Sequence, residues 1–157
     1  MFKILNLLSI IFCCTCAVST FFIDYSNQHL VPTHFNVLGK PDSWGSPYIC
    51  IIIALIAIAL YLVISYLCKH PEKMNYPFKV SAKFRNENMR IGIGLVVIIR
   101  FLVLLLLTNF NITIAFCPEQ HYTTIGLFMP IVTLCILTTI CISIYLFYKV
   151  WRKDKKQ

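Results

Sequence analysis

The chain has 157 residues, of which 59% are hydrophobic and 13% charged, and its formal net charge is +8. A soluble globular domain carries more charge and less apolar content, so this composition excludes that class. The 14 Lys and Arg residues are concentrated in two stretches of the chain, a distribution that argues against nucleic-acid binding.

Four apolar stretches are predicted to be membrane-spanning helices, because about 20 residues are enough to cross ~30 Å of hydrocarbon. In chain order they are residues 4–22, 48–67, 91–112 and 125–148. The third contains one charged residue, Arg100, and the other three contain none. Because these spans leave no room for a separate soluble domain, we predict one all-α integral membrane domain over residues 1–157.

The first span also has features of a signal peptide. Lys3 gives it a positive start, and Ala17-Val18-Ser19 is similar to a cleavage site with small residues. Its apolar run continues through Phe22, which is long for the apolar region of a signal peptide. We therefore predict that this helix is retained.

The positions of Lys and Arg predict the orientation in the membrane. Six of them lie in residues 69–90 and five in residues 149–156, whereas residues 23–47 contain only Lys40. Because Lys and Arg are enriched on the cytoplasmic side, we predict a cell-membrane protein with both termini and the loop 68–90 inside, and the loop 23–47 outside. The predicted partners at the basic stretches are membrane lipids and, at residues 68–90, a cytoplasmic protein.

The outer loop, residues 23–47, shows no strand or helix pattern, and a loop of that length is usually functional. Pro32 and Pro41 fix backbone angles, and Gly39 permits a positive φ, so we predict a folded loop. Ser46 followed by Pro47 predicts an N-cap and the first position of the second helix.

The candidate recognition residues of this loop are Gly39 and four polar or aromatic residues, His34, Asn36, Asp42 and Trp44. Trp44 precedes the second span, where aromatic residues sit at the level of the head groups. His34, Asn36 and Asp42 are predicted either to meet a ligand or to tie the loop together by bonding its backbone. Asp42 is expected to bond backbone amides close to the turn that Gly39 begins.

The inner loop, residues 68–90, alternates apolar and polar residues from Phe78 to Arg85. A period of two predicts a short strand or an extended segment on the membrane surface. Asn86 and Asn88 are predicted to cap the third helix.

Arg100 lies near the middle of the third span, where a charge is costly. It is predicted to extend toward the membrane surface, to bond carbonyls at a helix end, or to meet an acid from a loop that dips inward. Asp42 and Asp24 are the candidate acids, and Asn6 is a further polar residue in the first span. The sequence leaves two alternatives open: Arg100 is a tolerated charge, or it has a function.

The sequence gives little sign of a metal, a cofactor or an enzyme. Of the eight cysteines, six fall within the spans, where cysteine acts as a small apolar residue. The other two are close to histidines in the sequence: Cys68-x-His70 on the predicted inner side of the membrane and Cys117-x-x-x-His121 on the predicted outer side. No nucleophile, zinc-protease or phosphate-loop motif is present, and we predict no cofactor. If the protein is an enzyme, His34 and Asp42 are the candidate catalytic pair.

The outer loop resembles the signature of a bacterial membrane domain of unknown function that also forms the first part of the immunity protein against the sporulation-delaying peptide toxin. The residues that carry this resemblance are Pro32, His34, Phe35, Asn36, Gly39, Asp42, Trp44, Gly45 and Ser46. His70-Pro71-Glu72 and Asn75-Tyr76-Pro77 are similar to the inner loop of short four-helix members. Pro47 departs from the lysine of many members, and the longer immunity proteins have a further multi-helix domain.

Three functions follow as hypotheses. The resemblance implies a toxin-immunity or signalling-type protein that meets an extracytoplasmic peptide or toxin through its outer loop. A small transporter or permease accessory would use Arg100. A membrane-embedded enzyme would use His34 and Asp42.

Overall fold

The computed structural model describes residues 2–26, 30–36, 38, 40–116 and 122–156. Within those ranges, four helices are long and apolar enough to cross a membrane. They are α1 (Phe2–Ser19), α2 (Ile49–Lys69), α3 (Arg85–Phe116) and α4 (Tyr122–Lys155). The predicted all-α architecture is therefore confirmed, and the chain is a multi-pass membrane protein.

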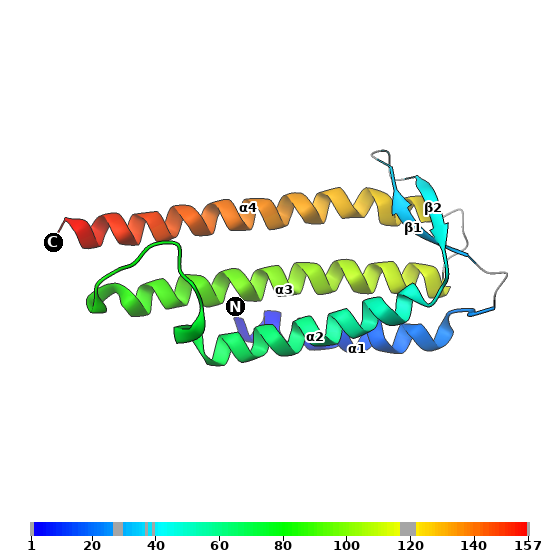
Figure 1. The fold of residues 1–157 in the computed structure, drawn as a ribbon, viewed down its shortest axis with the longest axis horizontal. Helices are drawn as coiled ribbons and strands as arrows, with labels where there is room; N and C mark the ends of the chain where they lie inside the picture. Colours follow the sequence, from blue (N-terminus) through cyan, green and yellow to red (C-terminus); the bar gives the residue numbers. More distant parts are fainter. Residues whose placement is uncertain (1, 27–29, 37, 39, 117–121, 157) are drawn as a thin grey trace.

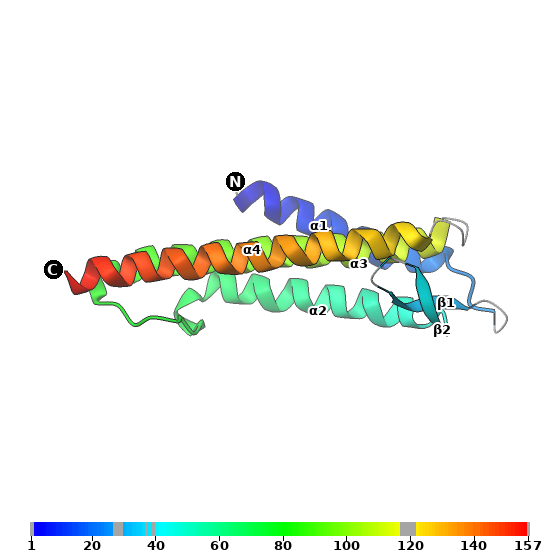
Figure 2. The ribbon, with the colours of Figure 1, turned by 90° about the horizontal axis from the view of Figure 1, so that it is seen from above.

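Helix α3 lies at the centre of the bundle and contacts α1, α2 and α4 (Figures 1 and 2). Between α1, α2 and α3, mostly small side chains surround Leu104; they are Cys13, Cys16, Ala54 and Ala57. Small residues allow membrane helices to approach closely, and the contact is stabilised by van der Waals packing. The two cysteines are free and buried, and they act as small packing residues.

The helix limits differ from those predicted. Helix α1 ends at Ser19, and a single 3-10 turn, η1 (Thr20–Phe22), completes the predicted span. Helices α3 and α4 extend well beyond the predicted ranges 91–112 and 125–148. The start of α3 and the end of α4 are basic turns that stay helical. Hydropathy predicts the part of a helix that suits lipid, and it does not predict where the helix ends.

The connections lie at opposite ends of the bundle. The segment between α2 and α3 shares one end with the C-terminus of α4, and α1 begins toward that end (Figure 1). The segment between α1 and α2 lies at the other end (Figures 1 and 2). The predicted orientation requires this arrangement, and the side that faces the cytoplasm stays a prediction.

The outer loop contains a β-hairpin that we did not predict. Strand β1 (Val31–Phe35) pairs antiparallel with β2 (Pro41–Gly45), and the register shifts on both sides of His34. The expectation of a loop without strands was wrong, because prolines at both strands and an irregular register hide the period of two in the sequence.

For the inner loop we predicted a short strand or an extended segment, and the strand was wrong. The described residues 70–84 contain two 3-10 turns, η2 (Pro71–Lys73) and η3 (Ala82–Phe84), and no strand. The apolar side chains pack on α4 instead: the ring of Phe78 lies 5.8 Å from that of Trp151. Helix α3 begins before both Asn86 and Asn88, so neither caps it. Asn88 donates to the carbonyl of Phe78 at 3.3 Å.

Candidate functional site

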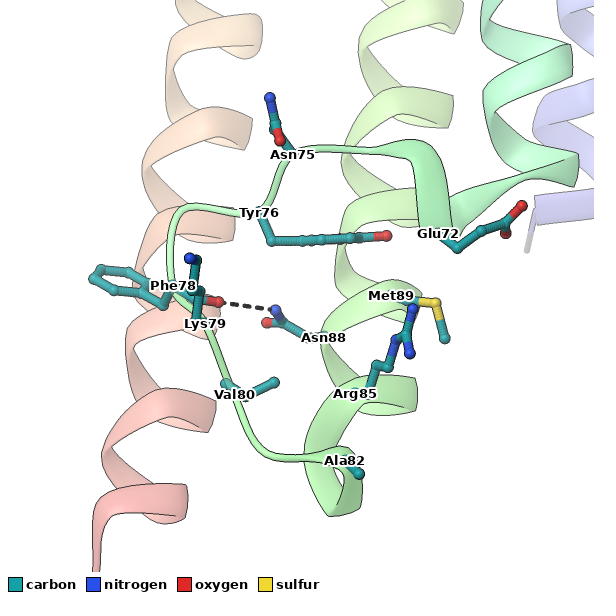
Figure 3. A pocket seen from close by; sticks show the side chains of 10 residues that line it. All are labelled: Glu72, Asn75, Tyr76, Phe78, Lys79, Val80, Ala82, Arg85, Asn88 and Met89. Carbon is teal, nitrogen blue, oxygen red and sulfur yellow. Dashed lines mark hydrogen bonds between the residues drawn. The ribbon is translucent and has the colours of Figure 1, made fainter.

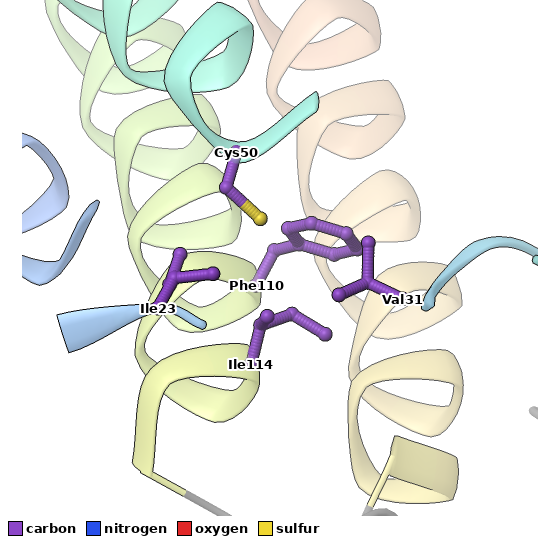
Figure 4. Close-up of a cluster of buried hydrophobic side chains, with 5 residues drawn as sticks. All are labelled: Ile23, Val31, Cys50, Phe110 and Ile114. Carbon is purple, nitrogen blue, oxygen red and sulfur yellow. The ribbon is translucent and has the colours of Figure 1, made fainter. Parts of the chain in front are cut away.

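The hairpin is seated on the bundle through the start of β1. Val31 is fully buried, and it joins a cluster with Ile23, Cys50, Phe110 and Ile114 (Figure 4). These residues come from four separate parts of the chain, so the cluster holds the hairpin against the ends of α2 and α3. Burial of this apolar surface fixes the position of the strands relative to the helices.

His34 and Asp42 form a pair across the hairpin. His34 Nδ1 lies 2.5 Å from Asp42 Oδ1, and the two side chains are 69% and 42% exposed. The register shift at His34 changes the direction of the side chains in β1. The His34 ring and the Asp42 carboxylate therefore meet on an accessible surface. Among the described residues, the carboxylate of Asp42 bonds the ring of His34. The amide of Gly39, just ahead of Asp42, lies outside the described residues, so the expected bond from Asp42 to the backbone stays a prediction.

Asn36 performs the backbone role that we expected of Asp42. Its Oδ1 accepts hydrogen bonds from the amides of Leu38 at 2.9 Å and Lys40 at 3.0 Å. The amide of Asn36 in turn donates to the Lys40 carbonyl at 2.9 Å. Asn36 therefore closes the turn of the hairpin, an arrangement that asparagine favours. Gly39, which the sequence placed in this turn, lies outside the described residues.

The second strand has a close backbone approach and an aromatic surface. A Cβ on Gly45 would lie 2.8 Å from Thr33 Cγ2, so β2 can approach β1 here only with glycine. Trp44 is 44% exposed and pairs with Pro32 across the hairpin. With His34 and Asp42, it gives the hairpin an accessible surface that has polar and aromatic groups.

The entry into α2 differs slightly from the prediction. The helix begins at Ile49, and the residue at its N-cap position is Tyr48, whose side chain makes no capping bond. Ser46 still contributes: its carbonyl accepts from the Ile49 amide at 3.2 Å, and its Oγ receives the Tyr48 amide at 3.4 Å. Pro47 therefore lies in a turn ahead of the helix.

Tyr25 fixes the segment that leads from α1 toward the hairpin. Its hydroxyl donates to the Thr20 carbonyl at 2.7 Å, and its ring lies 5.3 Å from that of Tyr48. Burial raises the pKa of this hydroxyl, so Tyr25 stays a neutral donor at physiological pH.

Arg100 is almost completely buried, with 2% of its surface exposed. Its guanidinium donates to Ser65 Oγ at 2.9 Å and to Asn6 Oδ1, and its carbon lies 5.0 Å from the centre of the Tyr61 ring. Helices α1 and α2 thus supply neutral oxygens and an aromatic face to a charge on α3. Among the described residues, Arg100 Nε has no hydrogen-bond partner.

Of the three alternatives left open for Arg100, pairing with a loop acid was wrong. Asp42 bonds His34, and Asp24 accepts from the Ser26 amide at 2.9 Å. The reason is distance along α3: Phe110, under the hairpin, is about 15 Å from Arg100 at 1.5 Å per residue. Asn6, which we noted only as a further polar residue, is one of its two hydrogen-bond partners, with Ser65.

A second polar layer lies nearer the hairpin, and sequence reasoning did not assign it a role. Asn111 is fully buried, and its Nδ2 donates to the carbonyls of Cys16 at 3.3 Å and Cys50 at 3.1 Å. Thr108 donates to the Phe12 carbonyl at 2.8 Å. The available signal was the position of these polar residues at the end of an apolar run, where polar side chains bond across helices.

The inner loop covers a cavity of about 450 Å³ (Figure 3). It is lined by Glu72, Asn75, Tyr76, Phe78, Lys79, Val80, Ala82, Arg85, Asn88 and Met89. The pKa of Glu72 is lowered, first by a hydrogen bond from its own backbone amide and then by His70. The inner loop, which is predicted to bind a cytoplasmic protein, therefore has a cavity lined by both charged and apolar groups.

The described residues contain no group of three or more His, Cys, Asp or Glu side chains that could hold a metal ion. Cys117 and His121, which the sequence brings close together, lie outside the described residues. In comparisons with known proteins, no family model, no curated protein and no solved structure matches the chain. The resemblance of the outer loop to the toxin-immunity signature therefore stays a prediction.

Proposed function

We propose that this chain is a bacterial cell-membrane protein that recognises an extracytoplasmic peptide through its hairpin, in a toxin-immunity or signalling-type role. The observation that carries the proposal is the accessible His34–Asp42 pair on a hairpin whose base is buried in the bundle. A binding surface that is ordered before the ligand arrives loses less conformational entropy on binding. The buried cluster of Val31 and the turn closed by Asn36 supply that order.

The chemistry of the hairpin suits a peptide with polar and apolar groups. Asp42 presents a carboxylate, and a carboxylate oxygen accepts from a peptide amide or an amino group. Trp44 adds an aromatic face, which favours apolar side chains and cations. The predicted outward orientation of residues 23–47 places these groups where an external peptide arrives.

The experiment expresses the chain in bacteria that are sensitive to the sporulation-delaying peptide toxin and measures survival. We expect the wild type to protect, and His34→Ala and Asp42→Ala to lose protection at unchanged membrane levels. Lys40→Ala is the matched control, because its side chain is exposed on the same hairpin and its hydrogen bonds to other described residues use only its backbone. The immunity role is wrong if the wild type gives no protection, or if both alanine variants protect fully.

A transporter-type role has one observation in its favour. Arg100 is buried, and the partners described for it are neutral, so its charge is uncompensated within the described residues. Intramembrane charges often mark ion or substrate pathways. If Arg100 holds an anionic substrate, Arg100→Lys retains more uptake than Arg100→Leu in cells that depend on the chain for transport.

The enzyme alternative is less favoured by the hairpin. Among the described residues, the ring of His34 bonds Asp42, and no serine or threonine hydroxyl and no cysteine thiol bonds it. A His–carboxylate pair orients a base, but nucleophilic catalysis also needs the nucleophile within hydrogen-bond reach.

A further inference from the structure

A groove runs between the start of α1 and the helices α3 and α4, at the end of the bundle opposite the hairpin. It consists of two adjoining cavities, of about 890 Å³ and about 270 Å³. Both are lined by Phe2, Arg90, Ile91 and Leu146, so they are two parts of one depression. The groove is separate from the hairpin, and its occupant does not depend on the proposed peptide recognition.

The outer part of the groove is basic. Its lining includes Lys83, Arg90, Lys149 and Lys153, against one acid, Glu87. Lys153 Nζ lies 3.8 Å from Glu87 Oε2, so Glu87 already forms a salt bridge within the protein. Within the described part of the chain, no salt bridge involves Arg90 or Lys149, and both side chains are exposed.

The inner part of the groove is largely apolar. Besides the four shared residues, it is lined by Gly94, Leu95, Ile98, Thr139, Ile142 and Ser143. Gly94 leaves space between α3 and the ring of Phe2, since a Cβ at position 94 would lie 3.2 Å from Phe2 Cζ. From Arg90 to Ile98 the helix rises about 12 Å, so the apolar floor continues into the depth of the membrane below the basic rim.

We propose that this groove binds one anionic phospholipid, with its phosphate at Arg90 and Lys149 and an acyl chain along the floor between α3 and α4. The argument is complementarity: the groove is cationic where the apolar spans begin and apolar below, which is the order of charge and hydrocarbon in such a lipid. A free phosphate would use only the rim and leave the floor unexplained. Anionic lipids of the cytoplasmic leaflet attract basic segments next to membrane helices.

The test titrates delipidated, detergent-purified protein with phosphatidylglycerol or with phosphatidylcholine of the same acyl chains, and native mass spectrometry measures the bound lipid. We expect one phosphatidylglycerol to bind in preference to phosphatidylcholine. Arg90→Gln/Lys149→Gln should weaken phosphatidylglycerol binding about tenfold or more, from the typical contribution of two basic residues near an anionic surface. The matched control is Arg152→Gln/Lys155→Gln, which removes the same charge from exposed positions on α4 that do not line the groove.

A second variant tests the floor without changing charge. Thr139→Phe should fill the inner cavity and weaken binding of both lipids, whereas the water-soluble head group glycerophosphoglycerol should compete only weakly with phosphatidylglycerol. Size-exclusion profiles and thermal unfolding establish that each variant is folded. Equal binding of the two lipids, equal loss in the control pair, or full competition by the soluble head group would each overturn the proposal, the last by reducing the groove to a phosphate site.

Discussion

Ser81 and Asp154 are joined by two hydrogen bonds, although 73 positions separate them in the sequence. Asp154 accepts from the Ser81 amide at 2.9 Å and from its hydroxyl at 2.5 Å. The contact fastens the inner loop to the last turn of α4, where Phe78 also stacks near Tyr148 and Trp151. The loop is therefore held to the bundle by a polar clamp and by aromatic packing.

The first prediction concerns this clamp. Asp154→Ala should release the inner loop, because both bonds end on its carboxylate, and trypsin should then cleave at Lys79 or Lys83 several-fold faster. Ser81→Ala should have a smaller effect, since the Ser81 amide can still donate to Asp154. Lys156→Gln is the control on the same helix end. Unchanged cleavage of Asp154→Ala would show that the aromatic packing alone holds the loop.

The helices could be predicted from the sequence because each span needs a long apolar run, and such runs are visible without knowledge of the partners. The start of α3 and the end of α4 could not, since these turns are rich in charged residues and are stabilised by contacts such as Lys153 with Glu87. The hairpin was missed because a two-stranded sheet this short depends on its support, and Val31 finds that support on distant helices.

The candidate site shows the same limit. Turn residues predicted that the outer loop is folded, and His34 with Asp42 was named as a candidate pair. Nothing in their spacing indicates that Asn36 accepts from the amides of Leu38 and Lys40. The hydrogen bond between Arg100 and Asn6 could not be predicted either, because 94 positions separate the two residues. Neutral partners for a buried charge leave no charge pattern in the sequence.

The second prediction concerns Arg100. Asn6→Leu should lower the free energy of unfolding by about 1 kcal/mol, because a hydrogen bond to a charged group is lost while the charge stays buried. Arg100→Leu should be neutral or stabilising, since an apolar residue replaces a desolvated charge. Thermal unfolding in detergent measures both.

The double variant provides the control for this pair. In the Arg100→Leu background, Asn6→Leu should have no further destabilising effect, because the interaction is already absent. An equal loss of stability from Asn6→Leu in both backgrounds would mean that Asn6 stabilises the bundle independently of Arg100.

The third prediction compares two asparagines of α3. Asn111→Leu should destabilise the protein by about 0.5–1.5 kcal/mol, since its amide bonds α1 and α2 within the membrane. Asn109→Leu is the matched control: both asparagines have a buried Oδ1 without a hydrogen-bond partner among the described residues, but only the Nδ2 of Asn111 donates to neighbouring helices. Replacement of Asn109 should be neutral or stabilising. Equal effects in thermal unfolding would contradict the assignment of Asn111 as the link between helices.

The fourth prediction concerns orientation and rests on the distribution of Lys and Arg. After Cys117 is replaced, Ser43→Cys should react with a membrane-impermeant thiol reagent applied to intact cells, and Lys79→Cys should react only after lysis. Ser43 and Lys79 are both exposed and lie at opposite ends of the bundle. Labelling of Lys79→Cys from outside would reverse the orientation and remove the hairpin from the extracytoplasmic side.

The last prediction separates the residues that build the hairpin from those that face a ligand. Asn36→Ala should make the hairpin more sensitive to proteolysis, because the Leu38 and Lys40 amides lose their acceptor. His34→Ala and Asp42→Ala should change the free energy of unfolding by less than about 1 kcal/mol, since pairs this exposed contribute little. Both should nevertheless abolish protection against the toxin. If they reduce accumulation as strongly as Asn36→Ala does, the His34–Asp42 pair is a structural tie, and the peptide must be sought at another surface.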